Sequence, residues 1–146
     1  MKPLVLIPQH FGSLVFDRRN SRYLPFDQEC TRLLRQSAHS PADPALAEPL
    51  HSLGFWTLDG YFDGEILTID TPSGHLAGPL AVHLEVTASC NLTCTHCFAG
   101  QLPRKEPALS LAELDRLFAQ LAALGSFRLG LTGGEPLLRK DLLEIL

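Results

Sequence analysis

The sequence predicts a chain of two parts: an α+β N-terminal part with the outline of a small winged helix, residues 1–75, and the first βα units of an α/β fold, residues 80–146. Two patterns and one motif predict this division. Short strand-like segments and turn residues dominate before residue 80, a strand–helix–strand–helix order follows it, and a cysteine group stands after the first strand of the second part. With 45% hydrophobic and 19% charged residues, the composition is that of a folded globular protein.

The N-terminal part begins with three segments that predict a small meander of strands, "PLVLI", "SLVFD" and "RYLPF", with the turn-forming "RRNS" before the third. A helix is expected next, because Asp27 is a suitable N-cap and Cys30, Leu33 and Leu34 repeat at helical spacing. Cys30 is expected to be a small core residue of this helix. The Ser/Pro/Asp-rich "SAHSPADP" then predicts a loop.

Two further elements complete the N-terminal part. "ALAEPLHSLGF" predicts a short helix, interrupted by proline and ending at Gly54. "YFDGEILTI" predicts a second hairpin with its turn at Asp63 and Gly64. Strands, two helices and a hairpin are the outline of a winged-helix unit.

The second part opens with the alternating segment "AVHLEV", a strand, and continues after the cysteines with the helix "SLAELDRLFAQLAALG". Ser110 and Glu113 form a capping box, Gly125 suits a C-cap, and leucines with one phenylalanine form an apolar stripe that is expected to be core. "FRLGL" predicts the next strand, "TGGEP" a loop and "LLRKDLLEIL" another helix. Strands joined by a helix run parallel, so we expect the cysteine loop and the "GGEP" loop to be neighbours at one edge of the sheet.

The cysteine group is the strongest chemical signal in the chain. Cys90, Cys94 and Cys97 are spaced C-x3-C-x2-C, and the fourth cysteine lies far upstream. Structural zinc takes four ligands, which would require His96 beside Cys97; a disulfide would leave one cysteine over. A [4Fe–4S] cluster held by three thiolates would have one iron open to a ligand that is not protein. All three alternatives stay open on the residues alone.

"CNLTCTHC", followed one βα unit later by "LTGGEP", resembles the radical S-adenosylmethionine (radical SAM) superfamily over residues 80–146. The resemblance implies that Cys90, Cys94 and Cys97 ligate a [4Fe–4S] cluster whose open iron chelates S-adenosylmethionine. It also implies that the loop after the second strand contacts the methionyl ammonium; its residues are Gly133, Gly134, Glu135 and Pro136. The position before the last cysteine is usually aromatic in the family, near the adenine, and here it is His96.

The resemblance further implies a reaction and an architecture. The reduced cluster would cleave S-adenosylmethionine to methionine and a 5′-deoxyadenosyl radical, with an electron donor as partner and no catalytic acid or base from this segment. The fold would be a partial, TIM-like barrel. Since residues 80–146 provide only its first βα units, we expect the chain to be the N-terminal fragment of a longer enzyme.

The N-terminal part resembles the winged-helix domains called RiPP recognition elements, which bind leader peptides of ribosomally made, modified peptides; "LVFDRRNSRYLPFDQECTRLLRQ" carries the resemblance. It implies a peptide maturase, with a leader or precursor peptide added as a strand to the hairpin region over residues 14–26. Arg32 and Arg35, at helical spacing, would present a charged rim to an acidic leader.

The composition excludes other classes. A net charge of −4, with only small arginine groups, does not predict nucleic-acid binding. The N-terminus lacks a signal-peptide core and no stretch reaches the length of a membrane span, so we expect a cytoplasmic protein. Two other functions remain open: a zinc-binding interaction module, in which the cysteines are structural, and a stand-alone leader-peptide-binding protein.

Overall fold

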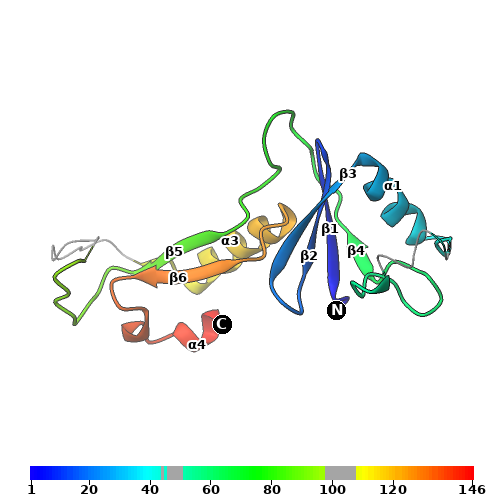
Figure 1. The fold of residues 1–146 in the computed structure, drawn as a ribbon. Helices are drawn as coiled ribbons and strands as arrows, with labels where there is room; N and C mark the ends of the chain where they lie inside the picture. Colours follow the sequence, from blue (N-terminus) through cyan, green and yellow to red (C-terminus); the bar gives the residue numbers. More distant parts are fainter. Residues whose placement is uncertain (44, 46–50, 98–107) are drawn as a thin grey trace. The chain divides into compact units, whose positions relative to one another are not determined.

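The computed structural model describes residues 1–43, 45, 51–97 and 108–146. These residues form two compact units: Met1–Leu80 with Ala123–Phe127, and Ala81–Ala122 with Arg128–Leu146. The first contains a four-stranded sheet and helix α1, and the second contains a two-stranded sheet and helix α3 (Figure 1). Among the helices of the described residues, none combines the length and the apolar character needed to cross a membrane.

The sheet of the first unit has the order β3-β2-β1-β4. Its strands are β1 (Leu4–Gln9), β2 (Gly12–Asp17), β3 (Arg22–Asp27) and β4 (Gly64–Ile66). The first three pair antiparallel, so the predicted meander is confirmed, while β4 pairs parallel with β1. In this order β3 and β4 are the two edge strands.

Apolar side chains cover both faces of this sheet, which is why β1 reads as a continuous hydrophobic run. One core cluster consists of Leu4, Leu6, Val15, Leu34, Phe55, Trp56 and Phe62. The other consists of Val5, Ile7, Leu14 and Phe16. Helix α1 (Gln28–Ser37) contributes Leu34 to the first cluster and is capped by Asp27, whose carboxylate accepts a hydrogen bond of 2.8 Å from Cys30 N. The predicted cap is confirmed, whereas Cys30 is only half-buried and outside both clusters.

The predicted hairpin with its turn at Asp63 and Gly64 is wrong. The chain reverses earlier, where Gly60 has a φ of 79° and its N–H donates to Thr57 O at 2.9 Å. Trp56 and Phe62 form an antiparallel bridge across that turn, and Gly64 begins β4 instead. Both Asp-Gly pairs have turn composition, but only Gly60 takes the left-handed conformation; Gly64 leaves room for the Phe62 ring.

The predicted second helix, residues 45–55, falls mainly on residues 46–50, which lie outside the described residues. The likeness of the first unit to a winged helix therefore stays a prediction. What the structure describes is a mixed sheet with one helix against it.

Ala123–Phe127 belongs to the first unit, although the sequence assigned it to the second part. The Tyr23 hydroxyl donates to Gly125 O at 3.0 Å and accepts from Phe127 N at 2.7 Å. The Phe127 ring stacks on Phe16, with 5.2 Å between ring centroids. These contacts place the segment against the β2–β3 face.

The second unit consists of β5 (Val82–Thr87), α3 (Leu111–Ala123), β6 (Leu129–Gly133), the short 3-10 helix η1 (Pro136–Leu138) and α4 (Leu142–Ile145). The two strands pair parallel, as predicted. The capping box is confirmed, because Ser110 N donates to Glu113 Oε2 at 2.8 Å and Glu113 N donates to Ser110 Oγ at 3.4 Å. Gly125, with a φ of 76°, has the predicted C-cap conformation.

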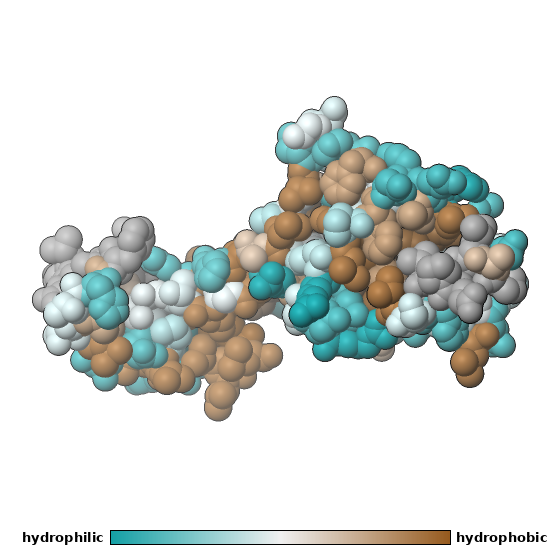
Figure 2. All heavy atoms as spheres, viewed as in Figure 1, coloured by the Kyte–Doolittle hydropathy of each residue, from teal (hydrophilic) through white to brown (hydrophobic). Residues whose placement is uncertain are grey.

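The apolar stripe of α3 is less buried than predicted. Leu114 is fully buried, but the other stripe residues within α3 are half-buried; among the described residues, the sheet of this unit has only two strands. Leu124, which follows α3, is exposed. Figure 2 shows hydrophobic side chains on the surface of η1 and α4, where Leu137, Leu143 and Leu146 are 80%, 85% and 83% exposed.

Candidate functional site

The cysteine loop, defined as residues 88–97, and the loop Gly133–Pro136 leave the same edge of the β5–β6 sheet. Two backbone hydrogen bonds join them: Gly134 N donates to Thr87 O, and Glu135 N donates to Ser89 O, both at 2.8 Å. The prediction that these loops are neighbours is therefore confirmed. Since both acceptors are main-chain carbonyls within three residues of Cys90, the second loop fixes the direction in which the cysteine loop begins.

The paired glycines are required by this close approach. Gly133 has a φ of 137°, a conformation that favours glycine, and a Cβ there would overlap Thr87 O. A Cβ on Gly134 would overlap Ser89 O and lie 2.9 Å from Ala88 O. We expected glycines here so that backbone could approach a ligand; in the structure the backbone that they approach is that of the cysteine loop.

Glu135 holds the turn that follows. Its Oε1 accepts a hydrogen bond of 3.0 Å from Leu137 N, which caps η1, and Pro136 occupies the first turn, where a missing N–H costs nothing. The half-buried carboxylate therefore has a backbone partner that orients it. Such a carboxylate can also be the anionic partner of a ligand ammonium.

The three cysteines lie on one loop but are not gathered into a metal site. Cys90, Cys94 and Cys97 are all exposed and free. Cys90 Sγ accepts from Leu92 N at 3.4 Å, and Cys97 N donates to Cys94 O at 3.2 Å. Within the described residues, no three His, Cys, Asp or Glu side chains are close enough together to hold a metal ion.

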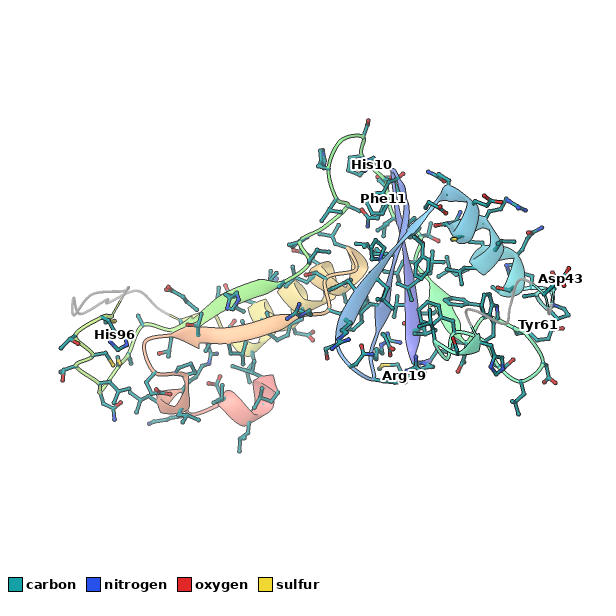
Figure 3. All side chains as sticks on the ribbon, viewed as in Figure 1. His10, Phe11, Arg19, Asp43, Tyr61 and His96 are labelled. Atoms are coloured by element: carbon teal, nitrogen blue, oxygen red, sulfur yellow. The ribbon has the colours of Figure 1, made fainter. Side chains whose placement is uncertain are left out.

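The donor set is nevertheless compatible with an iron–sulfur cluster. Three exposed thiols within eight positions can turn toward one ligand without unfolding a strand or helix, and thiolates are the ordinary ligands of such clusters. No disulfide forms among the described cysteines. His96, the other candidate ligand, lies exposed on the same loop (Figure 3).

Sequence reasoning missed Arg139, whose side chain is 7% exposed and donates a 2.7 Å hydrogen bond to Val86 O, just before the cysteine loop. The only sequence signal was Asp141 two residues later. An arginine and an aspartate at that spacing usually form a solvent-exposed ion pair, so the pattern did not distinguish Arg139 from an ordinary surface arginine.

Comparison with known proteins identifies a family for the second part of the chain. The family model described as "Radical SAM superfamily" matches residues 84–146. GTP 3′,8-cyclase of Mannheimia succiniciproducens is 48% identical over 67 residues, which are 44% of this chain and 20% of that protein. GTP 3′,8-cyclase of Marinobacter nauticus is 45% identical over 67 residues, with the same two shares.

A third relative, the probable GTP 3′,8-cyclase of Methanopyrus kandleri, is 43% identical over 67 residues, or 45% of this chain and 22% of that protein. The chain therefore spans about a fifth of the length of the curated relatives that it matches. No solved structure matches it.

Proposed function

Residues 84–146 belong to the radical SAM superfamily, and from this premise we propose that they form the cofactor-binding start of a radical SAM enzyme. Enzymes of this superfamily, GTP 3′,8-cyclase included, use a [4Fe–4S] cluster and S-adenosylmethionine. The observation that carries the proposal is the pair of hydrogen bonds that ties the three-cysteine loop to the Gly133–Pro136 loop. Both predicted binding segments thereby lie at one edge of a parallel sheet, where α/β folds bind their ligands.

In this proposal the residues have separate roles. Cys90, Cys94 and Cys97 supply three thiolates, and Gly133–Pro136 receives the methionyl ammonium, with Glu135 as its negative partner. His96 stacks near the adenine. When bound, the cluster would supply the one-electron chemistry for reductive cleavage of S-adenosylmethionine, with an electron donor as partner. The role of residues 84–146 in this proposal is to bind and orient the reactants.

The test is anaerobic reconstitution with ferrous iron and sulfide. We expect about four irons and four sulfides per chain, since one [4Fe–4S] cluster is held by this ligand set. Replacing any of Cys90, Cys94 and Cys97 by serine should abolish the bound sulfide, whereas the half-buried Cys30, replaced by alanine, is the matched control. Uptake of one zinc without sulfide would instead support the zinc-binding interaction module.

The substrate is a separate question, and two candidates differ in their support. The curated relatives are named for GTP, but they match only 44–45% of this chain. The first unit favours a peptide, because it contains a groove of about 820 Å³ beside an edge strand. We propose that this unit is a recognition element for a leader or precursor peptide, and that the enzyme modifies that peptide.

The groove runs between α1 and β4. Alternate residues of the β4 segment, Gly64, Ile66 and Thr68, line one side, and one face of α1 lines the other. An extended peptide can add to such an edge strand through backbone hydrogen bonds. We place the peptide at β4 rather than at the β2–β3 hairpin predicted from the sequence, because Pro25 in β3 has no N–H and so removes a donor from that edge.

The charge of the groove selects the kind of peptide. Lys2, Arg32 and Arg35 line it, the two arginines are exposed, and none of its lining residues in the described structure is acidic. Lys2 Nζ already donates to Gly64 O at 3.1 Å, at the edge where the peptide would pair. The proposed occupant is therefore an extended, acidic peptide.

The test is titration of the whole chain with a short acidic peptide, followed by amide shifts. We expect amide shifts at β4 and α1, and a peptide affinity that falls with added salt. Arg35→Glu should lower the peptide affinity about tenfold, which is the order of the contribution of one charge-assisted hydrogen bond. Arg22→Glu, a like substitution on the exposed face of β3, should bind as the wild type does. Binding of GTP in the groove without binding of the peptide, or shifts at β3, would overturn the peptide proposal.

A peptide-binding chain that assembles no cluster would support the stand-alone leader-peptide-binding protein. The two experiments therefore separate the enzyme from both other functions, because one measures only the cysteine loop and the other only the first unit.

A further inference from the structure

Strand β5 contains an irregularity where it enters the cysteine loop. Glu85 pairs with Thr132 and Thr87 pairs with Gly133, so Val86 has no partner on β6. This is the arrangement of a β-bulge, in which one extra residue bends the strand and leaves the ladder. Val86 is fully buried, and a buried carbonyl without a ladder partner needs another donor.

Arg139 supplies that donor. Its Nη1 donates to Val86 O at 2.7 Å, and its Nη2 donates to Leu109 O at 2.6 Å. These two carbonyls stand on either side of residues 87–108, the stretch that contains all three cysteines of the motif. One guanidinium therefore joins the chain before the cysteine loop to the chain that enters α3.

Asp141 holds the guanidinium in this position. Arg139 Nε lies 2.8 Å from Asp141 Oδ1, and Nη2 lies 3.1 Å from Oδ2, so the guanidinium binds the carboxylate in a bidentate manner. The hydrogen bond from Arg139 lowers the pKa of Asp141 below its ordinary value, so the carboxylate stays ionised and balances the buried cation. A lysine could not contact both carbonyls and the carboxylate in this geometry.

We infer that Arg139 is a positioning residue for the cysteine loop: it fixes the two chain ends between which Cys90, Cys94 and Cys97 must come together around a metal cluster. The thiols are exposed and separate in the structure, so binding must order them. When the ends of a segment are already fixed, the segment has fewer conformations before it binds a ligand. It therefore loses less conformational entropy on binding. The part of this inference that concerns a cluster rests on the proposed function; the closure of the segment does not.

The test compares Arg139→Gln and Arg139→Lys with a matched control, Lys140→Gln, at the exposed neighbouring position. The first measurement is hydrogen exchange of the whole chain without metal. For both Arg139 variants we expect faster exchange in residues 85–89 and 109–111, while the middle of α3 and the β1–β2 strands keep their wild-type exchange. Lys140→Gln should leave all of these unchanged.

The second measurement is iron release to a chelator from protein reconstituted with ferrous iron and sulfide. Loss of a charge-assisted hydrogen bond should speed release by roughly tenfold in Arg139→Gln. Asp141→Asn, which keeps an oxygen acceptor but loses the charge, should give a smaller increase, and it remains informative if Arg139→Gln does not fold. The electron paramagnetic resonance spectrum of the reduced cluster should broaden in the Arg139 variants, which a purely global loss of stability would not cause.

The outcomes separate the inference from the proposed function. Wild-type exchange in both segments of Arg139→Gln, or iron release at the wild-type rate, would overturn the inference. If the wild-type chain binds zinc without sulfide, the proposed function fails, while the exchange measurement still decides whether Arg139 closes the segment.

Discussion

Replacing Gly134 with alanine should push apart the two loops of the candidate site. The φ of Gly134 is not in the left-handed region, so the substitution introduces no backbone strain, and its effect comes from the space available. A Cβ there would overlap Ser89 O and lie 2.9 Å from Ala88 O. These are main-chain atoms at the start of the cysteine loop, which cannot rotate away as a side chain can.

The expected cost follows from these contacts. Inserting a methyl group where backbone must move costs about 1–3 kcal/mol. The movement also weakens the bonds from Gly134 N to Thr87 O and from Glu135 N to Ser89 O, and each backbone hydrogen bond contributes about 1 kcal/mol. A local destabilisation of about 3 kcal/mol corresponds to a loss of roughly a hundredfold in amide protection.

Hydrogen exchange resolved by peptide measures this effect, because it reports residues 81–97 and 128–146 separately from the first unit. Gly130→Ala is the matched control on β6: its Cβ would meet the end of the exposed His83 side chain, with Nδ1 at 3.0 Å, and that ring can rotate. We expect Gly130→Ala to change protection by less than a factor of about three, within the range of ordinary surface substitutions. Equal protection in Gly134→Ala and Gly130→Ala would refute the argument from close approach.

Three further results are expected from named contacts. The hydrogen bond from Arg19 holds the pKa of Asp17 below its ordinary 3.8, so the pair stabilises the first unit above that pH, and this stabilisation is lost as the pH falls through the lowered pKa. Asp17→Asn should therefore weaken the fall of the urea unfolding midpoint at acid pH, with unfolding followed by tryptophan fluorescence. An unchanged fall of the midpoint would contradict this. Burial raises the pKa of the Cys30 thiol, so iodoacetamide at pH 8 should label it more slowly than the three exposed cysteines; equal labelling rates by peptide mass spectrometry would be against it. Ser110→Ala removes the cap that pairs with Glu113 and should cost α3 about 1 kcal/mol, seen as faster exchange in its first turn but not its last.

Much of the fold was predictable because its signals lie close together in the chain. The meander, the caps at Asp27 and Ser110, and the C-cap at Gly125 each depend on side chains within a few residues of the backbone groups that they satisfy. The parallel pairing of β5 and β6 also followed from the order of the elements, since two strands of one sheet joined through a helix run parallel, with a right-handed crossover. For the same reason the neighbouring position of the two candidate-site loops was predictable.

Longer-range features were not predictable. Composition could not decide which Asp-Gly pair makes the turn; that depended on Gly64 pairing with Leu4, sixty positions away, beside the Phe62 ring. Nor could the local pattern place Phe127 against Phe16. The connecting segment that contains Phe127 shows neither a helical nor a strand periodicity of apolar residues. These choices were made by the burial of apolar surface between distant segments, which the local pattern does not record.

For the candidate site, the sequence by itself determined the donor set: three thiols in eight positions, followed one βα unit later by the "GGEP" loop, with the family that these motifs indicate. Only the tertiary structure decided how that loop is held. Gly134 approaches Ser89, and Arg139 reaches Val86 across 53 positions, because the bulge in β5 leaves a buried carbonyl that must find a donor wherever the fold brings one. Ligand chemistry is a property of residue types and survives in the sequence, whereas the satisfaction of a buried carbonyl depends on which chain passes beside it.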